Sequence, residues 1–112
     1  MTKKIKEVTT LDEYSDFVES KIITEGDVRL IENVLGLVGE SGEVAEKLKK
    51  MIRDKQQVKV EDMMKELGDC LFYIQAICNF LNVHIGAVLQ MNVDKLNGRE
   101  ERGTLQGNGD DR

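Results

Sequence analysis

The chain has 112 residues and a formal net charge of −5, contains no proline, and is rich in charged and aliphatic residues. This length predicts one domain with a modest core that oligomerisation would supplement, and the acidic balance argues against a nucleic acid polymer as the main partner. We find no apolar run of about 20 residues and no signal-like N-terminus, so the sequence predicts neither a membrane span nor secretion. The two cysteines, Cys70 and Cys78, lack metal-ligand spacing. They are expected to be reduced and buried, which is typical of a cytoplasmic protein.

The spacing of apolar residues predicts an all-α fold, a four-helix bundle. A polar lead-in over residues 1–9 precedes Thr10, which together with Glu13 has the spacing of a helix capping box. Helices are expected at 11–23, 28–53, 61–81 and 84–98. We expect the helical domain to cover 10–99, and a polar, glycine-rich tail to follow at 100–112.

The connector at 54–59 is short enough to make the second and third predicted helices antiparallel. From Cys70 onward the third helix is apolar on all sides, which is typical of a helix without a solvent-facing side. We therefore expect it to be buried, either at the centre of the bundle or between subunits.

Two acidic pairs mark the second and third predicted helices: Glu40 with Glu43, and Glu66 with Asp69. Residues three apart are neighbours on a helix surface, so the antiparallel helices would gather four carboxylates around one point. Two such charges 4 Å apart repel by about 4 kcal/mol at an effective dielectric of 20, so protons or a cation must neutralise them. All-oxygen ligands favour Mg²⁺, Mn²⁺ or Ca²⁺ over Zn²⁺, and we expect Mg²⁺, with Mn²⁺ as a possible substitute. Acidic pairs at this spacing are also common on solvated helix faces.

Three glycines, Gly36, Gly39 and Gly42, lie inside the second predicted helix. Each costs roughly 0.8–1 kcal/mol relative to alanine in a helix interior. Close approach of another helix, or room for a ligand, would explain them. The alternative is that the helix is kinked or broken at these positions.

Cationic and amide side chains follow the acidic pairs at helical spacing and could donate to phosphate oxygens. The candidates are Lys47, Lys50, Asn92, Lys95 and Arg99. Solvated lysines that support their own helix are the plainer interpretation of Lys47 and Lys50.

Three aromatic residues, Tyr14, Phe17 and Tyr73, could contact a base or sugar, although core packing is the more common role of such side chains. His84, the single histidine, is expected at the surface or at a helix cap.

The motifs Gly39-Glu-Ser-Gly-Glu43 and Glu66-Leu-Gly-Asp69 resemble those of the MazG-like, all-α nucleotide pyrophosphohydrolases. The segment Asn92-Val-Asp-Lys-Leu96, with Arg99 and the closing Gly109-Asp-Asp-Arg112, is similar to a common subgroup of that family. The resemblance covers about 28–112, most of the chain.

The resemblance implies a homodimer or dimer of dimers that hydrolyses nucleoside triphosphates to monophosphate and pyrophosphate with Mg²⁺, in a house-cleaning role for non-standard or deoxy nucleotides. It implies that Glu40, Glu43, Glu66 and Asp69 are the metal ligands. Glu40 is the candidate for orienting or deprotonating the attacking water. Gly39 stands where the longer family motif has its first glutamate, which could mean fewer metals or another substrate.

Two other classes of protein remain open. A nucleotide-binding or regulatory assembly protein of the same fold would keep the bundle without turnover, and the glycine at position 39 is its best support. A di-iron carboxylate bundle typically needs two Glu-x-x-His pairs. Here His84 follows Leu81 rather than a glutamate at that spacing, which argues against the di-iron class.

Overall fold

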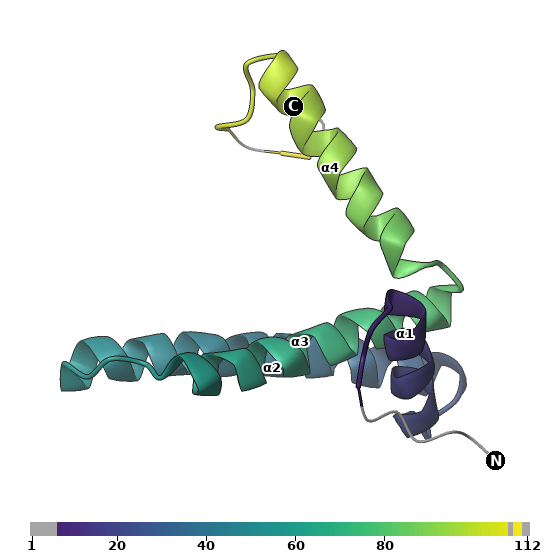
Figure 1. The fold of residues 1–112 in the computed structure, drawn as a ribbon, viewed down its shortest axis with the longest axis horizontal. Helices are drawn as coiled ribbons and strands as arrows, with labels where there is room; N and C mark the ends of the chain where they lie inside the picture. Colours follow the sequence, from purple (N-terminus) through teal and green to yellow (C-terminus); the bar gives the residue numbers. More distant parts are fainter. Residues whose placement is uncertain (1–6, 108, 111–112) are drawn as a thin grey trace. The chain divides into compact units, whose positions relative to one another are not determined.

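The computed structural model describes residues 7–107 and 109–110, and over these residues it holds four helices and no strand (Figure 1). The helices are α1 (Leu11–Lys21), α2 (Gly26–Asp54), α3 (Val60–Leu81) and α4 (Ile85–Glu101). The all-α prediction is confirmed, and the predicted ends lie within a few residues of the observed ones. The chain divides into two compact units, of which one ends at Asn82 and the other begins at Val83.

The start of α1 follows the predicted capping box in part. The Thr10 hydroxyl accepts a hydrogen bond from the Glu13 backbone N–H at 3.1 Å, as an N-cap residue does. The Glu13 carboxylate in turn accepts from the hydroxyls of Thr9 and Thr10. The cap therefore fixes where α1 begins, with side-chain hydroxyls as the partners of Glu13.

α2 is one helix of 29 residues that runs unbroken through all three glycines. The alternative of a helix broken there is therefore wrong. Gly36 has a packing reason, because a Cβ at this position would lie 2.5 Å from Cζ of Tyr73 on α3. A Cβ on Gly39 or Gly42 would meet no atom of the described chain within 4 Å. Close helix approach thus explains the first glycine only.

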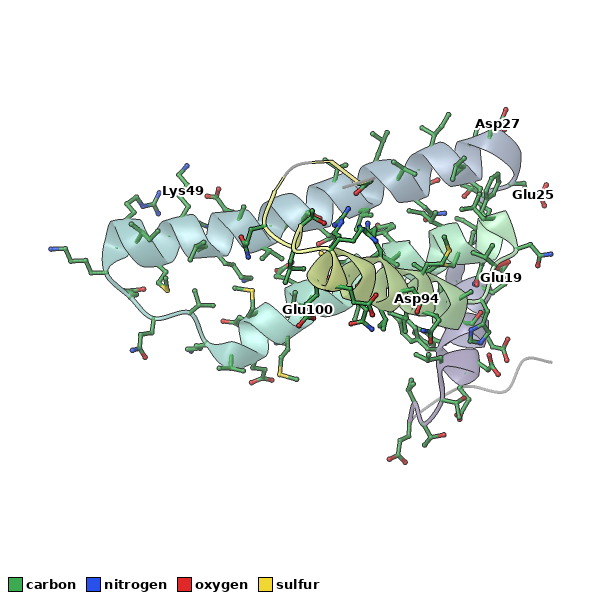
Figure 2. The ribbon with its side chains drawn as sticks, turned by 90° about the horizontal axis from the view of Figure 1, so that it is seen from above. Glu19, Glu25, Asp27, Lys49, Asp94 and Glu100 are labelled. Carbon is green, nitrogen blue, oxygen red and sulfur yellow. The ribbon has the colours of Figure 1, made fainter. Side chains whose placement is uncertain are left out.

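α2 and α3 form an antiparallel hairpin and lie side by side, as Figure 1 and Figure 2 both show. Lys55 ends α2 in the left-handed region, with φ of 56°, and its N–H donates to the Met51 carbonyl. The short connector therefore reverses the chain as predicted.

α3 is buried along one face near its C-terminal end, at Gln75, Ala76 and Cys78. Earlier on the helix, Leu67 and Leu71 are 48% and 50% exposed. Complete burial of the third helix is thus not reached within one chain, and burial between subunits stays a prediction. Both cysteines are free thiols, as expected, but only Cys78 is buried, whereas Cys70 is half-buried.

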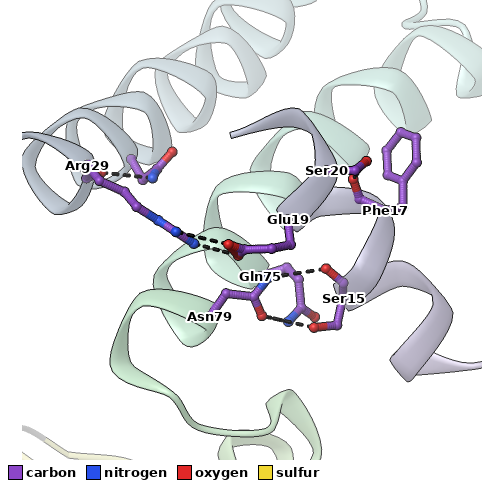
Figure 3. A network of polar contacts seen from close by, with 8 residues as sticks. Ser15, Phe17, Glu19, Ser20, Arg29, Gln75 and Asn79 are labelled. Atoms are coloured by element: carbon purple, nitrogen blue, oxygen red, sulfur yellow. Dashed lines mark hydrogen bonds and ion pairs between the residues drawn. The ribbon is translucent and has the colours of Figure 1, made fainter. Parts of the chain in front are cut away.

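A polar network fastens α1 to the hairpin (Figure 3). The Arg29 guanidinium on α2 donates to both carboxylate oxygens of Glu19 on α1. The Ser15 hydroxyl on α1 and the Gln75 amide on α3 both donate to Asn79 Oδ1, each at 2.9 Å. The Asn79 amide donates back to the Ser15 carbonyl oxygen at 3.1 Å.

The second unit consists of α4 and the segment after it. His84 Nδ1 accepts the Gly86 N–H at 2.8 Å, so the prediction of a capping histidine is confirmed. The tail then folds back along α4 as far as Asp110, where it contacts Arg99. Asp111 and Arg112, which close the motif of the sequence resemblance, lie outside the described residues.

In the part of the chain that the structure describes, no single helix is long and apolar enough to cross a membrane.

Candidate metal site

Three carboxylates meet between α2 and α3: Glu40 from α2, and Glu66 and Asp69 from α3. One oxygen of each lies within 4.8 Å of the other two. Glu40 and Glu66 are half-buried, and Asp69 is exposed. We call these three residues the carboxylate cluster. The antiparallel hairpin thus brings together residues that are 26 to 29 positions apart in the chain.

The cluster carries an electrostatic cost that a cation would remove. Partial burial raises the pKa of Glu40, and the negative charges of Asp69, Glu66 and Glu43 raise it further. A shift in this direction means that the folded chain resists full ionisation of the site. A divalent cation would reverse that preference, because it favours the charged form of every carboxylate around it.

The donor set fits Mg²⁺ or Mn²⁺. All three groups offer hard carboxylate oxygens, and none of them is a thiolate or imidazole. Mg²⁺ commonly takes one or two carboxylates and completes its shell with waters and substrate phosphates. The exposure of Asp69 leaves one side of the cluster open to such ligands.

Glu43, the fourth predicted ligand, is not in the cluster. It is exposed one turn further along α2, yet it is near enough for its charge to raise the pKa of Glu40. Its role as a metal ligand stays a prediction.

Lys47 and Lys50 lie beyond the acidic residues on α2, as their spacing predicts. Lys47 Nζ is 3.6 Å from Glu66 Oε1, so this lysine forms an ion pair with the cluster. Lys50 is exposed and lines a pocket at the turn that joins the two helices. The ion pair was not predicted, because the residues lie on different helices and no local spacing relates them.

Tyr14 and Phe17 project from α1, with their rings stacked 6.2 Å apart. Burial raises the pKa of the Tyr14 hydroxyl, and the nearby charge of Asp69 adds to the effect. Tyr14 is therefore close to the cluster. Tyr73 packs against Gly36 and edge-on against Phe72, so in this chain its ring belongs to the helix contact.

The predicted phosphate donors of α4 contact the tail. Arg99 is 4% exposed, and its Nη2 donates to the carbonyl oxygens of Gly109 and Asp110 at 3.1 and 2.8 Å. Lys95 Nζ lies 3.4 Å from Asp110 Oδ1. The hydrogen bond and charge of Lys95, and then those of Arg99, lower the pKa of Asp110. Asn92 is exposed. Phosphate binding by these three α4 residues stays a prediction. The contact of Asp110 with α4 was not predicted, although the sequence resemblance included the closing Gly-Asp-Asp motif.

The chain is similar in sequence to a known protein family and to a phage protein. Residues 30–104 match the model of the MazG nucleotide pyrophosphohydrolase domain. The Gene 37 protein of Mycobacterium phage L5 is 43% identical over 95 residues, which cover 78% of this chain and 83% of that protein. No solved structure gives a significant match. The matched stretch contains every member of the carboxylate cluster.

Proposed function

Because the chain belongs to the MazG nucleotide pyrophosphohydrolase family, we propose that it hydrolyses nucleoside triphosphates to nucleoside monophosphate and pyrophosphate. Mg²⁺ is the proposed cofactor, Mn²⁺ a substitute, and the cytoplasm, where nucleotides are made and used, is the proposed compartment. The observation that carries the proposal is the carboxylate cluster, because it offers a hard-metal site with an open side. Non-standard or deoxy nucleotides are the proposed substrates.

Glu40, Glu66 and Asp69 would hold the cation, with Glu43 as the fourth ligand. The chemistry that the cation supplies is neutralisation of the phosphate charge and polarisation of the phosphorus–oxygen bonds. Glu40 is the one member of the cluster from α2, and it faces both of the others across the hairpin. We propose that the Glu40 carboxylate accepts a proton from the attacking water. The water oxygen bonds to the α-phosphorus, the bond from that phosphorus to the bridging oxygen breaks, and pyrophosphate leaves.

The exposed apolar residues favour a homodimer or a dimer of dimers. On α2, Ile31, Val38, Ala45 and Ile52 recur every seven residues and are all exposed. On α3, four apolar residues are exposed at alternating spacings of four and three: Val60, Met64, Leu67 and Leu71. Such spacing is typical of helix seams packed against other helices. We call these two sets the seam residues, and a second hairpin of the same chain is their proposed partner.

A second candidate function is nucleotide binding without turnover. Gly39 favours it, because the chain lacks a carboxylate where the longer family motif has one. Packing does not require this glycine, since a Cβ there would meet no described atom within 4 Å. The missing charge would lower the number of metal ligands and with it the catalytic rate.

The test is release of pyrophosphate from a panel of standard and modified nucleoside triphosphates, with Mg²⁺, with Mn²⁺ and with chelator. We expect metal-dependent release from one or a few members of the panel. Glu40→Gln and Asp69→Asn should each lower turnover about a hundredfold or more, in the range usual for groups that take part in proton transfer. The control is Glu61→Gln, an equal charge change at an exposed position of α3 outside the cluster.

Wild-type turnover in Glu40→Gln would show that the cluster is not the active site. Helical protein that binds nucleotide and Mg²⁺ but releases no pyrophosphate from any substrate would favour the second candidate.

A further inference from the structure

The turn that joins α2 to α3 borders an open pocket of about 210 Å³. Six polar side chains line it: Lys47, Lys50, Gln56, Gln57, Lys59 and Asp62. Met51 and Val58 complete the lining, which thus includes three lysines and one aspartate in a chain whose formal net charge is −5. We call it the lysine pocket. Its excess of positive charge and its amide donors suit an anion rich in oxygen.

Backbone hydrogen bonds hold the two ends of the turn. Lys55 lies in the left-handed region, and the Gln56 N–H donates to the Met51 carbonyl at 3.2 Å. At the start of α3, the Met63 N–H donates to the Lys59 carbonyl at 3.2 Å. The pocket is therefore framed by the end of α2, the start of α3 and the connector between them. Gln56, Gln57 and Lys59 are exposed, so a ligand can reach them.

The lysine pocket adjoins the carboxylate cluster. Lys47 belongs to both, because it lines the pocket and its Nζ lies 3.6 Å from Glu66 Oε1. Asp62 of the pocket precedes Glu66 of the cluster by four residues, which is about one turn of α3. Cluster and pocket thus follow one another along the same hairpin, one able to hold a cation and the other an anion.

We propose that the lysine pocket binds the β- and γ-phosphoryl groups of the substrate, while a cation in the carboxylate cluster would hold the α-phosphoryl group, an inference that rests on the proposed function. Lys47, Lys50 and Lys59 act as point charges on the phosphate oxygens, and Gln56 and Gln57 donate hydrogen bonds. This assigns the role of substrate discrimination to the turn. Triphosphates fill both parts of the site, whereas monophosphates cannot reach the pocket. The same pocket then holds the pyrophosphate product after cleavage.

The test uses inorganic pyrophosphate as the probe, in chelator, so that no cation bridges it to the carboxylates. Binding is followed by NMR of the backbone amides around the turn, in wild type and in the double variant Lys50→Gln/Lys59→Gln. The matched control is Lys49→Gln/Lys65→Gln, which makes the same charge change on the same hairpin outside the pocket. The Lys49 side chain points away from α3 (Figure 2).

We expect pyrophosphate to shift the amides of the turn, and the pocket variant to weaken its Kd about tenfold or more. The control variant should weaken it less than about twofold. In the turnover assay, the pocket variant should raise KM for the triphosphate and relieve inhibition by pyrophosphate, again relative to the control.

Equal weakening in the two double variants would overturn the pocket, because only overall charge would then matter. If that result accompanies metal-dependent turnover in wild type, the proposed function stands and the pocket alone is wrong. Lysine-dependent binding of pyrophosphate without any turnover would leave the pocket standing as an anion site and overturn the hydrolase.

Discussion

Gly36 on α2 and Tyr73 on α3 are in direct contact, because the tyrosine ring fills the space in which a Cβ of residue 36 would lie. Glu40 follows Gly36 by four residues on α2, and Asp69 precedes Tyr73 by four residues on α3. Because the two helices are antiparallel, both carboxylates lie one turn from the contact, on the same side of it. The contact therefore lies one helical turn from the point at which these two carboxylates meet. We expect the metal site to depend on this glycine, although it holds no metal itself.

Gly36→Ala should destabilise the protein by about 1–3 kcal/mol, which is the usual cost of overpacking a tight contact. Gly42→Ala is the matched control, because a Cβ there meets no described atom within 4 Å. It should stabilise the helix by roughly 0.8–1 kcal/mol, through helix propensity alone. Urea unfolding of both variants measures the difference. Gly36→Ala as stable as wild type would mean that α2 and α3 pack differently in solution.

Glu40→Gln should stabilise the metal-free protein at neutral pH. The pKa of Glu40 is raised in the folded chain, chiefly by burial and then by Asp69 and Glu66. The sign follows from linkage: a raised carboxyl pKa contributes stability below the ordinary value, and that stability is lost as pH rises through the raised one. The neutral amide avoids this loss.

Thermal unfolding of both proteins in chelator, between pH 4 and pH 8, measures this effect. The difference between Glu40→Gln and wild type should grow with pH across that window. Added Mg²⁺ should then stabilise wild type more than the variant. A variant less stable than wild type at pH 8 in chelator would contradict the electrostatic account.

Much of this arrangement follows from local sequence patterns. Helical periodicity predicts the four helices, and the Thr10 cap predicts the start of the first one. The short connector predicts that α2 and α3 are antiparallel, which brings Glu40 close to Glu66 and Asp69. Contacts between side chains on different helices could not be predicted, because helical periodicity relates only residues of the same helix. Ser15 and Asn79 are 64 positions apart, and the partner of Glu66 is a lysine on another helix. Such pairs depend on how helices cross, which side-chain spacing within one helix does not encode.

Asn79→Ala should destabilise the docking of α1 by about 2–4 kcal/mol. The substitution removes three hydrogen bonds, at roughly 1 kcal/mol each, and leaves the buried Gln75 amide without its acceptor. Urea unfolding gives the loss in stability, and hydrogen exchange of the α1 amides shows whether the loss is local to that helix. Asn97→Ala, at an exposed position of α4, is the control. Unchanged exchange in α1 would show that the network does not hold this helix.

Val38→Glu should lower the mass of the assembly in solution. Val38 is 66% exposed in the single chain and lies at the centre of the α2 seam residues. A charge buried there between two hairpins would lack a partner, which is among the most costly changes an interface can suffer. Light scattering after gel filtration measures the mass. Lys21→Gln makes an equal charge change on α1, away from the seam residues, and should leave the mass unaltered. An unaltered mass in both variants would contradict the proposal that the seam residues form the subunit interface.

Lys95→Gln should raise the pKa of Asp110 and loosen the tail. Lys95 is the main cause of the lowered pKa, and Arg99 adds to it through its own contact with the same carboxylate. A lowered carboxyl pKa stabilises the tail contact above the ordinary value, and this contribution is lost as pH falls through the lowered one. Carbon-13 NMR of the Asp110 carboxyl during a pH titration measures the shift, with Lys65→Gln as the control on another helix. We expect the variant to titrate at higher pH than the control. Identical curves would mean that α4 does not hold the tail through this charge pair.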